Sequence, residues 1–284
     1  MRSRDAMLAT LTAVIWGLAF VAVKFGLESF SAPQLTALRF LIACLPIFLV
    51  ARPAISWFLL VQIGLTLFAG QFLLLFFAYT RGLSPGVASV SQQMQAVFTV
   101  LLAAAFLREL PSRGQYLGMG IACTGLALVG STVGVDLPLA GLALGLAGAL
   151  SWAVGNVLVK RTANVSVFPL VVWASLVPPL PALALSAVYD RHAPLLSAVA
   201  RASWLSIGAA AYLGVGATVV AYAIWGDLLH RYPAAVITPF AFLAPCVGVA
   251  ASAIIFGETF GPVRYAGMAL ILGGLAVIAR PGAS

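Results

Sequence analysis

Long apolar segments alternate along this chain with short connectors that hold most of the polar residues. Each segment is about 20 residues long, the length that an α-helix needs to cross the hydrocarbon core of a bilayer. A segment inside lipid must satisfy its own backbone hydrogen bonds, which favours helices over isolated strands. We therefore predict an all-α membrane protein with ten transmembrane helices, over residues 6–25, 33–51, 57–79, 85–107, 113–131, 139–160, 168–188, 203–226, 233–256 and 262–280.

The composition supports a membrane protein and narrows the classes of partner. Hydrophobic residues make up 63% of the chain and charged residues only 8%, whereas soluble domains carry about 25% charged residues. The net charge of +8 comes without a basic run, so we expect a lipid bilayer and no nucleic acid as partner. More Lys and Arg residues, Arg280 included, fall on the side of the N-terminus than on the other side. This bias predicts that both termini are cytoplasmic.

Two sequence patterns occur once in each half of the chain. IWGLAFVAVK at 15–24 and SWAVGNVLVK at 151–160 each place a Trp eight residues before a Lys. FLRELPSRGQYLGMGIACTGLALVG at 106–130 parallels IFGETFGPVRYAGMALILGGLAVIA at 255–279. We predict two five-helix repeats, over residues 1–132 and 137–284. The connector 189–203 is the expected place for the extra residues of the second repeat.

The odd number of helices per repeat determines the relative orientation of the two halves. After five helices the chain is on the other side of the membrane, so the second repeat is inverted. Inverted repeats are typical of secondary transporters. Lys24 and Lys160, which end the first helix of each repeat, are then expected at opposite membrane faces.

Several separated motifs resemble one transporter family. Two inverted five-helix repeats, with a Glu after the fourth and ninth helices, resemble the EamA family of the drug/metabolite transporter superfamily. The segments WGLAFVAVKFGL, LRF, SWAVGNVLVK and AYAIWGDLLHRY are similar to its O-acetylserine/cysteine exporter branch. The resemblance covers nearly the whole chain. It implies an inner-membrane exporter of amino acids and related metabolites that works by alternating access.

Polar side chains inside a membrane are costly, so those retained often face a cavity or another helix. Around SVSQQMQAVFT, Gln92 and Gln95 share one helical face with Ser91 and Thr99, whereas Gln93 points elsewhere. Amides and hydroxyls can bind both the carboxylate and the ammonium group of a zwitterion. The alternative is a hydrogen-bonded seam between helices. Gln71 is a similar but single case, with the same two interpretations.

A second set of candidates consists of one cation and several aromatic residues. Arg39 lies about two turns into the second helix, where it could bind a substrate carboxylate, extend toward the membrane surface or pair with helix-end carbonyls. Trp16 and Trp152 lie too deep for interfacial anchors, which leaves packing or a cavity wall. Further wall candidates are Asn156, Tyr222 and Trp225.

The acidic residues give no sign of a proton relay, because all of them lie at or near helix ends. Glu109 and Glu258 are expected to cap the following helices or to pair with loop arginines. Proton coupling stays open if Asp227 or Glu28 is buried.

No pattern in the sequence indicates an enzyme. The two histidines, His192 and His230, form neither a metal site nor a catalytic triad, and we expect no cofactor. The predicted function is a secondary transporter for O-acetylserine- or cysteine-like metabolites. The alternatives are export of another small solute, such as an aromatic amino acid, a drug or a sugar phosphate, and a membrane scaffold that transports nothing.

Overall fold

The computed structural model describes residues 1–134, 137–162 and 165–279, and these residues form helices joined by short connectors. Eight helical stretches within these ranges are long and apolar enough to cross a membrane. The all-α architecture predicted from the sequence is thus confirmed for the described residues. Arg280 and the end of the second predicted repeat lie outside them.

Helices of the first half follow the first five predicted ranges, and serines begin several of them. Ser31 and Ser112 each form a capping box with the Gln three residues later, and Ser84 caps its helix through its hydroxyl. The elements are α1 (Ser3–Gly26), α2 (Ala32–Ala43), the 3-10 helix η1 (Leu45–Leu49), α3 (Trp57–Ile63), the π-helical segment η2 (Gly64–Gly70), α4 (Gln71–Thr80), α5 (Pro85–Ser91), the 3-10 helix η3 (Gln92–Met94), α6 (Gln95–Leu107) and α7 (Arg113–Gly130).

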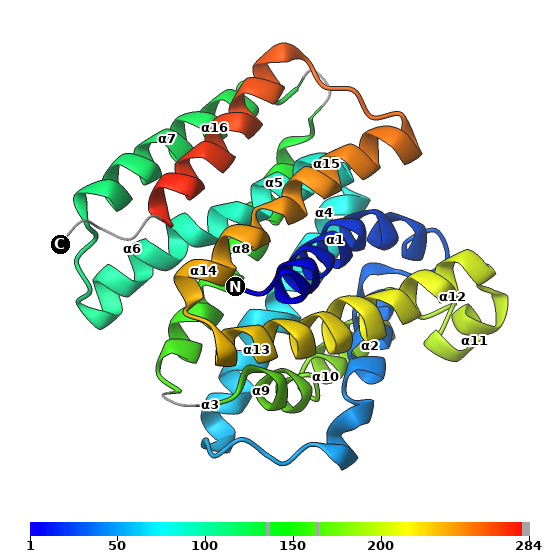
Figure 1. Cartoon of the computed structure of the whole chain (residues 1–284). Helices are drawn as coiled ribbons and strands as arrows, with labels where there is room; N and C mark the ends of the chain where they lie inside the picture. Colours follow the sequence, from blue (N-terminus) through cyan, green and yellow to red (C-terminus); the bar gives the residue numbers. More distant parts are fainter. Residues whose placement is uncertain (135–136, 163–164, 280–284) are drawn as a thin grey trace.

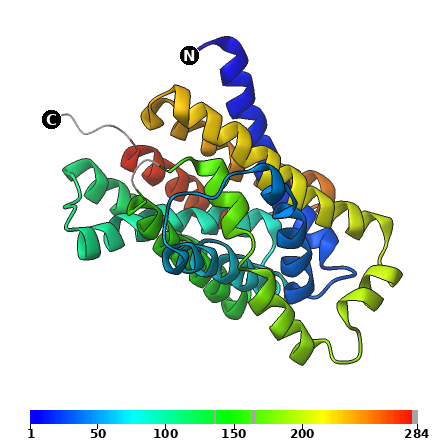
Figure 2. The ribbon, with the colours of Figure 1, turned by 90° about the horizontal axis from the view of Figure 1, so that it is seen from below.

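The second half is also helical, and it has an additional short helix in one connector. Its elements are α8 (Leu139–Lys160), α9 (Val167–Ala174), α10 (Pro179–Tyr189), α11 (Leu195–Arg201), α12 (Trp204–Ala211), the π-helical segment η4 (Tyr212–Val220), α13 (Ala221–Arg231), α14 (Ala234–Ala241), α15 (Leu243–Phe256) and α16 (Pro262–Ile278). The added helix α11 lies in the connector where extra residues were expected. Figure 2 shows it at the opposite side of the bundle from the N-terminal end of α1.

Two of the predicted long helices are broken next to prolines. The break between α9 and α10 includes Pro178, and the break between α14 and α15 falls at Phe242, between Pro239 and Pro245. Proline lacks a backbone N–H and its ring clashes with the preceding turn, which explains both positions. In contrast, the π-helical segments η2 and η4 interrupt matching helices of the two halves without proline.

Helices of the first half pack against helices of the second half (Figure 1). α1 packs along α15 of the other half, and α8 packs along α4 and α6. α7 and α16 lie side by side at one edge of the bundle. There a Cβ on Gly125 would lie 2.5 Å from the carbonyl oxygen of Gly267, so only glycine permits this approach.

Matching ion pairs join the ends of the packed helices. The Nζ of Lys24, at the end of α1, lies 3.8 Å from Oε1 of Glu258, which follows α15. Lys160, at the end of α8, pairs with Glu109, which follows α6. The expectation that the two glutamates cap the next helices or pair with arginines is therefore wrong. Ser112 caps α7 instead, and the long packing of α1 on α15 and of α8 on α6 brings each Lys to its Glu.

Candidate functional site

Aromatic candidates gather around the π-helical segment η4. The indole Nε1 of Trp16 donates a hydrogen bond of 3.1 Å to the carbonyl oxygen of Ala217 in η4. The Trp16 ring lies 5.3 Å from the ring of Tyr222 and 5.0 Å from that of Trp225, measured between centroids. Sequence reasoning left packing and a cavity wall open for these residues. The structure brings all three together in one half-buried aromatic group.

Arg39 is a buried cation beside this group, with 4% of the residue exposed. Its Nε donates a hydrogen bond of 3.1 Å to Oγ1 of Thr218 in η4, and its guanidinium lies 3.9 Å from the centre of the Phe72 ring. No carboxylate among the described residues lies within 4.0 Å of it. A buried charge is costly without a partner, and an aromatic face offsets only part of that cost. Arg39 is thus a buried guanidinium with the donors to bind a carboxylate.

Amide candidates form a contact between α6 and α8. The Nδ2 atom of Asn156 donates to Oε1 of Gln95 at 2.8 Å and to Oγ1 of Thr99 at 3.2 Å. All three residues are half-buried. This is the geometry of an interhelical seam, and it leaves the oxygen of Asn156 and the Gln95 amide nitrogen for other partners.

Gln92 and Gln71 lie deeper and border the same glycine of α8. A Cβ on Gly148 would lie 3.0 Å from the backbone oxygen of Gln71 and 3.3 Å from Nε2 of Gln92. That Nε2 donates to the carbonyl oxygen of Gly145 at 2.7 Å, whereas Oε1 of Gln92 is buried with no hydrogen-bond partner. An unpaired buried oxygen is unfavourable. Gln92 thus retains an acceptor that a ligand could use.

Trp152 lies on α8 one turn before Asn156, between the aromatic group around η4 and the amide residues. It packs against the cluster that includes the buried rings of Phe40 and Phe68, as does Tyr222. The nine predicted residues therefore lie on six neighbouring parts of the fold: α1, α2, α4, the α5–α6 region, α8 and α13.

Sequence reasoning missed the backbone around which this site is built. Thr218, the carbonyl of Ala217 and the ring of Phe72 contact the predicted residues, but none was a candidate. The available signal was the glycine content of GLTLFAG and YLGVGATVV, at matching places in the two halves. π-Helical turns expose backbone groups and are frequent at functional sites.

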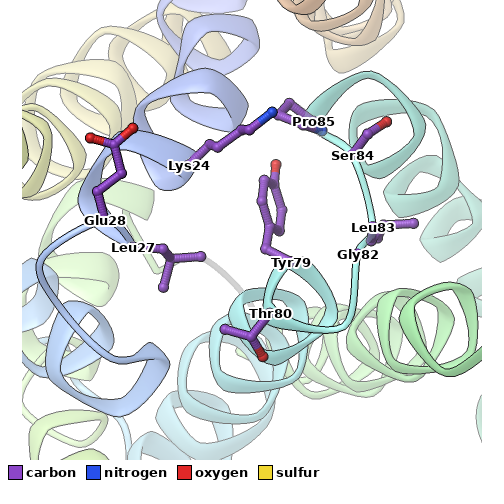
Figure 3. Close-up of a pocket in the computed structure, with 9 residues that line it drawn as sticks. All are labelled: Lys24, Leu27, Glu28, Tyr79, Thr80, Gly82, Leu83, Ser84 and Pro85. Carbon is purple, nitrogen blue, oxygen red and sulfur yellow. The ribbon is translucent and has the colours of Figure 1, made fainter. Parts of the chain in front are cut away.

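A separate cavity of about 320 Å³ lies at the end of α1 (Figure 3). It is lined by Lys24, Leu27, Glu28, Tyr79, Thr80, Gly82, Leu83, Ser84 and Pro85. None of the nine predicted residues lines it. The described part of the chain contains no group of three or more His, Cys, Asp or Glu residues that could hold a metal ion.

Comparisons with known proteins agree with this architecture. The chain is 38% identical to a protein of Salmonella typhimurium named "Probable amino-acid metabolite efflux pump", and the match covers 97% of the chain and 94% of the relative. It is 36% identical, with the same coverage, to a protein of that name from Escherichia coli. A "Probable terminal-alkyne amino-acid exporter" of Streptantibioticus cattleyicolor is 26% identical over 98% of the chain and 94% of the relative.

Structure and family comparisons lead to the same fold. A crystal structure with 19% identity superimposes with a TM-score of 0.63 and covers 98% of this chain and 96% of its own. The model of the EamA-like transporter family matches residues 4–131 and 139–280. Together with the apolar helices, this match makes the protein a multi-pass membrane protein. The chain belongs to the EamA-like transporter family.

Proposed function

We propose that this protein exports O-acetylserine, cysteine or closely related amino acids from the cytoplasm across the inner membrane. The observation that carries the proposal is Arg39, a buried guanidinium with a hydroxyl and an aromatic ring as neighbours and no carboxylate within 4.0 Å among the described residues. An amino acid supplies the missing carboxylate. The names of the relatives at 36–38% identity support this substrate class.

The amide residues complete the proposed site. The ammonium group of the substrate needs acceptors, and the unpaired Oε1 of Gln92 is a buried acceptor. Gln95 and Asn156 extend the same polar face, with Gln71 beside it. Trp16, Trp152, Tyr222 and Trp225 provide the walls in this proposal.

Alternating access between two inverted five-helix repeats is the proposed mechanism. Three features support it: the two matched ranges of the family model, the matching ion pairs, and the π-helical segments at matching places. Ten spans, with both termini on the same side, follow if α7 and α16 also cross the membrane. The excess of Lys and Arg on the side of the N-terminus favours the cytoplasm for that side. Inverted repeats then exchange their arrangements, so one side opens as the other closes.

The position of the acidic residues bears on proton coupling. The sequence left proton coupling open if Asp227 or Glu28 were buried. Both residues are exposed in the structure. Among the residues that the structure describes, Asp5 is a buried carboxylate instead. It accepts hydrogen bonds from Arg231 at 2.9 Å and from Tyr232 at 2.7 Å, which satisfies its charge within the protein. Our proposal includes no coupling ion.

A second candidate function is export of a larger apolar or aromatic amino acid. The ring group of Trp16, Tyr222 and Trp225 favours it, because aromatic walls bind apolar side chains well. The relative named as a terminal-alkyne amino-acid exporter also supports it. A sugar phosphate fits less well, since Arg39 has aromatic and hydroxyl neighbours in place of further cations.

Reconstitution into liposomes separates these alternatives. Labelled O-acetylserine, cysteine, phenylalanine and a sugar phosphate are offered to the same preparation, with protein-free liposomes as control. We expect saturable uptake of O-acetylserine that cysteine inhibits. Saturable uptake of phenylalanine alone would establish the second candidate, and no uptake of any solute would support the scaffold.

A further inference from the structure

The cavity at the end of α1 contains a lysine whose hydrogen-bonding capacity is largely unused. Lys24 is 44% exposed and its ammonium lies 3.8 Å from Oε1 of Glu258, a distance for an ion pair but not for a hydrogen bond. The ammonium also lies 3.9 Å from the centre of the Phe256 ring. Lys24 can therefore donate to a further acceptor.

Glu258 is an incomplete partner as well. Its Oε2 accepts a hydrogen bond of 3.3 Å from the backbone N–H of Gly86, while its buried Oε1 accepts none. The carboxylate is thus held beside α5 by Gly86, at the limit of its reach to Lys24. Another carboxylate in the cavity could approach Lys24 more closely than Glu258 does.

The cavity lining fits a molecule that carries both charges. Lys24 and Glu28 contribute one positive and one negative charge, and Tyr79, Thr80 and Ser84 add hydroxyls. Figure 3 shows the Tyr79 hydroxyl pointing toward the side of the cavity where the end of Lys24 and Pro85 lie. That hydroxyl donates to the carbonyl oxygen of Phe20 at 2.9 Å, so its oxygen is free to accept from an ammonium group. A volume of about 320 Å³ accommodates a small amino acid.

We propose that this cavity is a second binding site for a zwitterionic amino acid, in which the ligand carboxylate replaces Glu258 as the partner of Lys24. The inference rests on the proposed function, because it treats the ligand as the exported solute. In the proposed topology this end of α1 is at the outer face. The cavity is then an exit site, and its ligand loosens the ion pair that joins α1 to the end of α15.

Protection of an introduced thiol tests the site directly. The native cysteines, Cys44, Cys123 and Cys246, are replaced by Ala, and the exposed Thr80 of the cavity lining is changed to Cys. The rate of maleimide labelling of purified protein is measured with O-acetyl-L-serine as probe. Its methyl ester, which lacks the carboxylate, serves as the ligand control. We expect O-acetyl-L-serine to slow labelling and the ester to leave the rate unchanged.

Three variants distinguish competition at Lys24 from a structural effect. Lys24→Gln should abolish protection. Glu258→Gln should lower the half-protecting concentration about fivefold, because it removes a weak competitor for the half-exposed Lys24. Lys160→Gln changes the lysine that ends α8, away from the cavity. In this variant O-acetyl-L-serine should protect the introduced thiol as it does in the parent. Protection that survives Lys24→Gln, or that weakens in Glu258→Gln, would overturn the proposal. So would a loss of protection in Lys160→Gln as large as the loss in Lys24→Gln.

The two proposals fail separately. Protection in a protein that transports nothing would refute the exporter and leave the cavity site standing. Normal uptake of O-acetylserine without any protection would refute the cavity site alone. If Lys24→Gln does not fold, Glu258→Gln still decides, since only competition predicts tighter binding.

Discussion

Asn156 of α8 donates a hydrogen bond of 2.8 Å to the side-chain oxygen of Gln95 on α6, and so joins the two ranges that match the family model. The contact is half-buried and lies one turn from Trp152. A purely structural seam and a substrate-binding face both need this bond. They differ in what its loss does to transport.

Asn156→Ala is expected to raise the KM for O-acetylserine about tenfold, the effect of losing roughly one good hydrogen bond to a charged group. If the bond only holds the two helices together, its loss would lower stability by about 0.6–2 kcal/mol and leave KM unchanged. Uptake into liposomes and thermal unfolding in detergent measure the two effects. Gln93→Ala, in η3 and pointing away from the face of Gln92 and Gln95, is the amide control and should leave KM unaltered.

Arg39→Gln is expected to raise KM for amino acids about 10–100-fold, because a charge-assisted bond to the substrate carboxylate is lost. Arg39→Lys keeps the positive charge but lacks the planar guanidinium, so its KM should lie between those of the parent and Arg39→Gln. Competition by the methyl ester of O-acetylserine, which has no carboxylate, should be equally weak in parent and variant. An unchanged KM in Arg39→Gln would exclude Arg39 as the carboxylate partner.

Gly125→Ala should destabilise the protein by about 1–3 kcal/mol through overpacking. Its new methyl group would lie 2.5 Å from the carbonyl oxygen of Gly267 and force α7 away from α16. Gly120→Ala is the matched control on the same helix, since nothing lies within 4 Å of a Cβ there. Thermal unfolding in detergent should show a lower midpoint for the first variant only. Equal midpoints would mean that α7 and α16 are packed less closely than described.

Lys24→Cys and Lys160→Cys test the inverted arrangement. In a cysteine-free background, a membrane-impermeant maleimide should label position 24 from the outside of intact cells and position 160 only after the membrane is opened. The prediction follows from the odd number of spans in each repeat. Labelling of both positions from the same side would contradict the inverted repeats.

Much of the helix pattern was predictable, because apolar segments of this length have one stable conformation in lipid. The repeated Trp and Lys of 15–24 and 151–160 also indicated corresponding helices. In the structure both of these lysines form an ion pair with a glutamate of the other half. The partners of these lysines were missed, since Glu258 and Glu109 are distant in sequence and reach them only through helix packing.

The site was predictable by residue type but not by arrangement. Arg39, Gln92 and Asn156 stood out because polar groups are rare inside a membrane. Thr218 did not, because a single Thr in an apolar helix is common and its role depends on the π-helical turn of η4. The partners of Arg39 depend on tertiary packing, which no local pattern contains.

Uptake of labelled O-acetylserine into inside-out membrane vesicles tests the central claim most directly, because export from the cell appears there as accumulation. Vesicles with the parent protein should accumulate the solute saturably, cysteine should compete, and vesicles with Arg39→Gln should accumulate much less at the same protein level. Accumulation no greater than in vesicles without the protein would contradict the account.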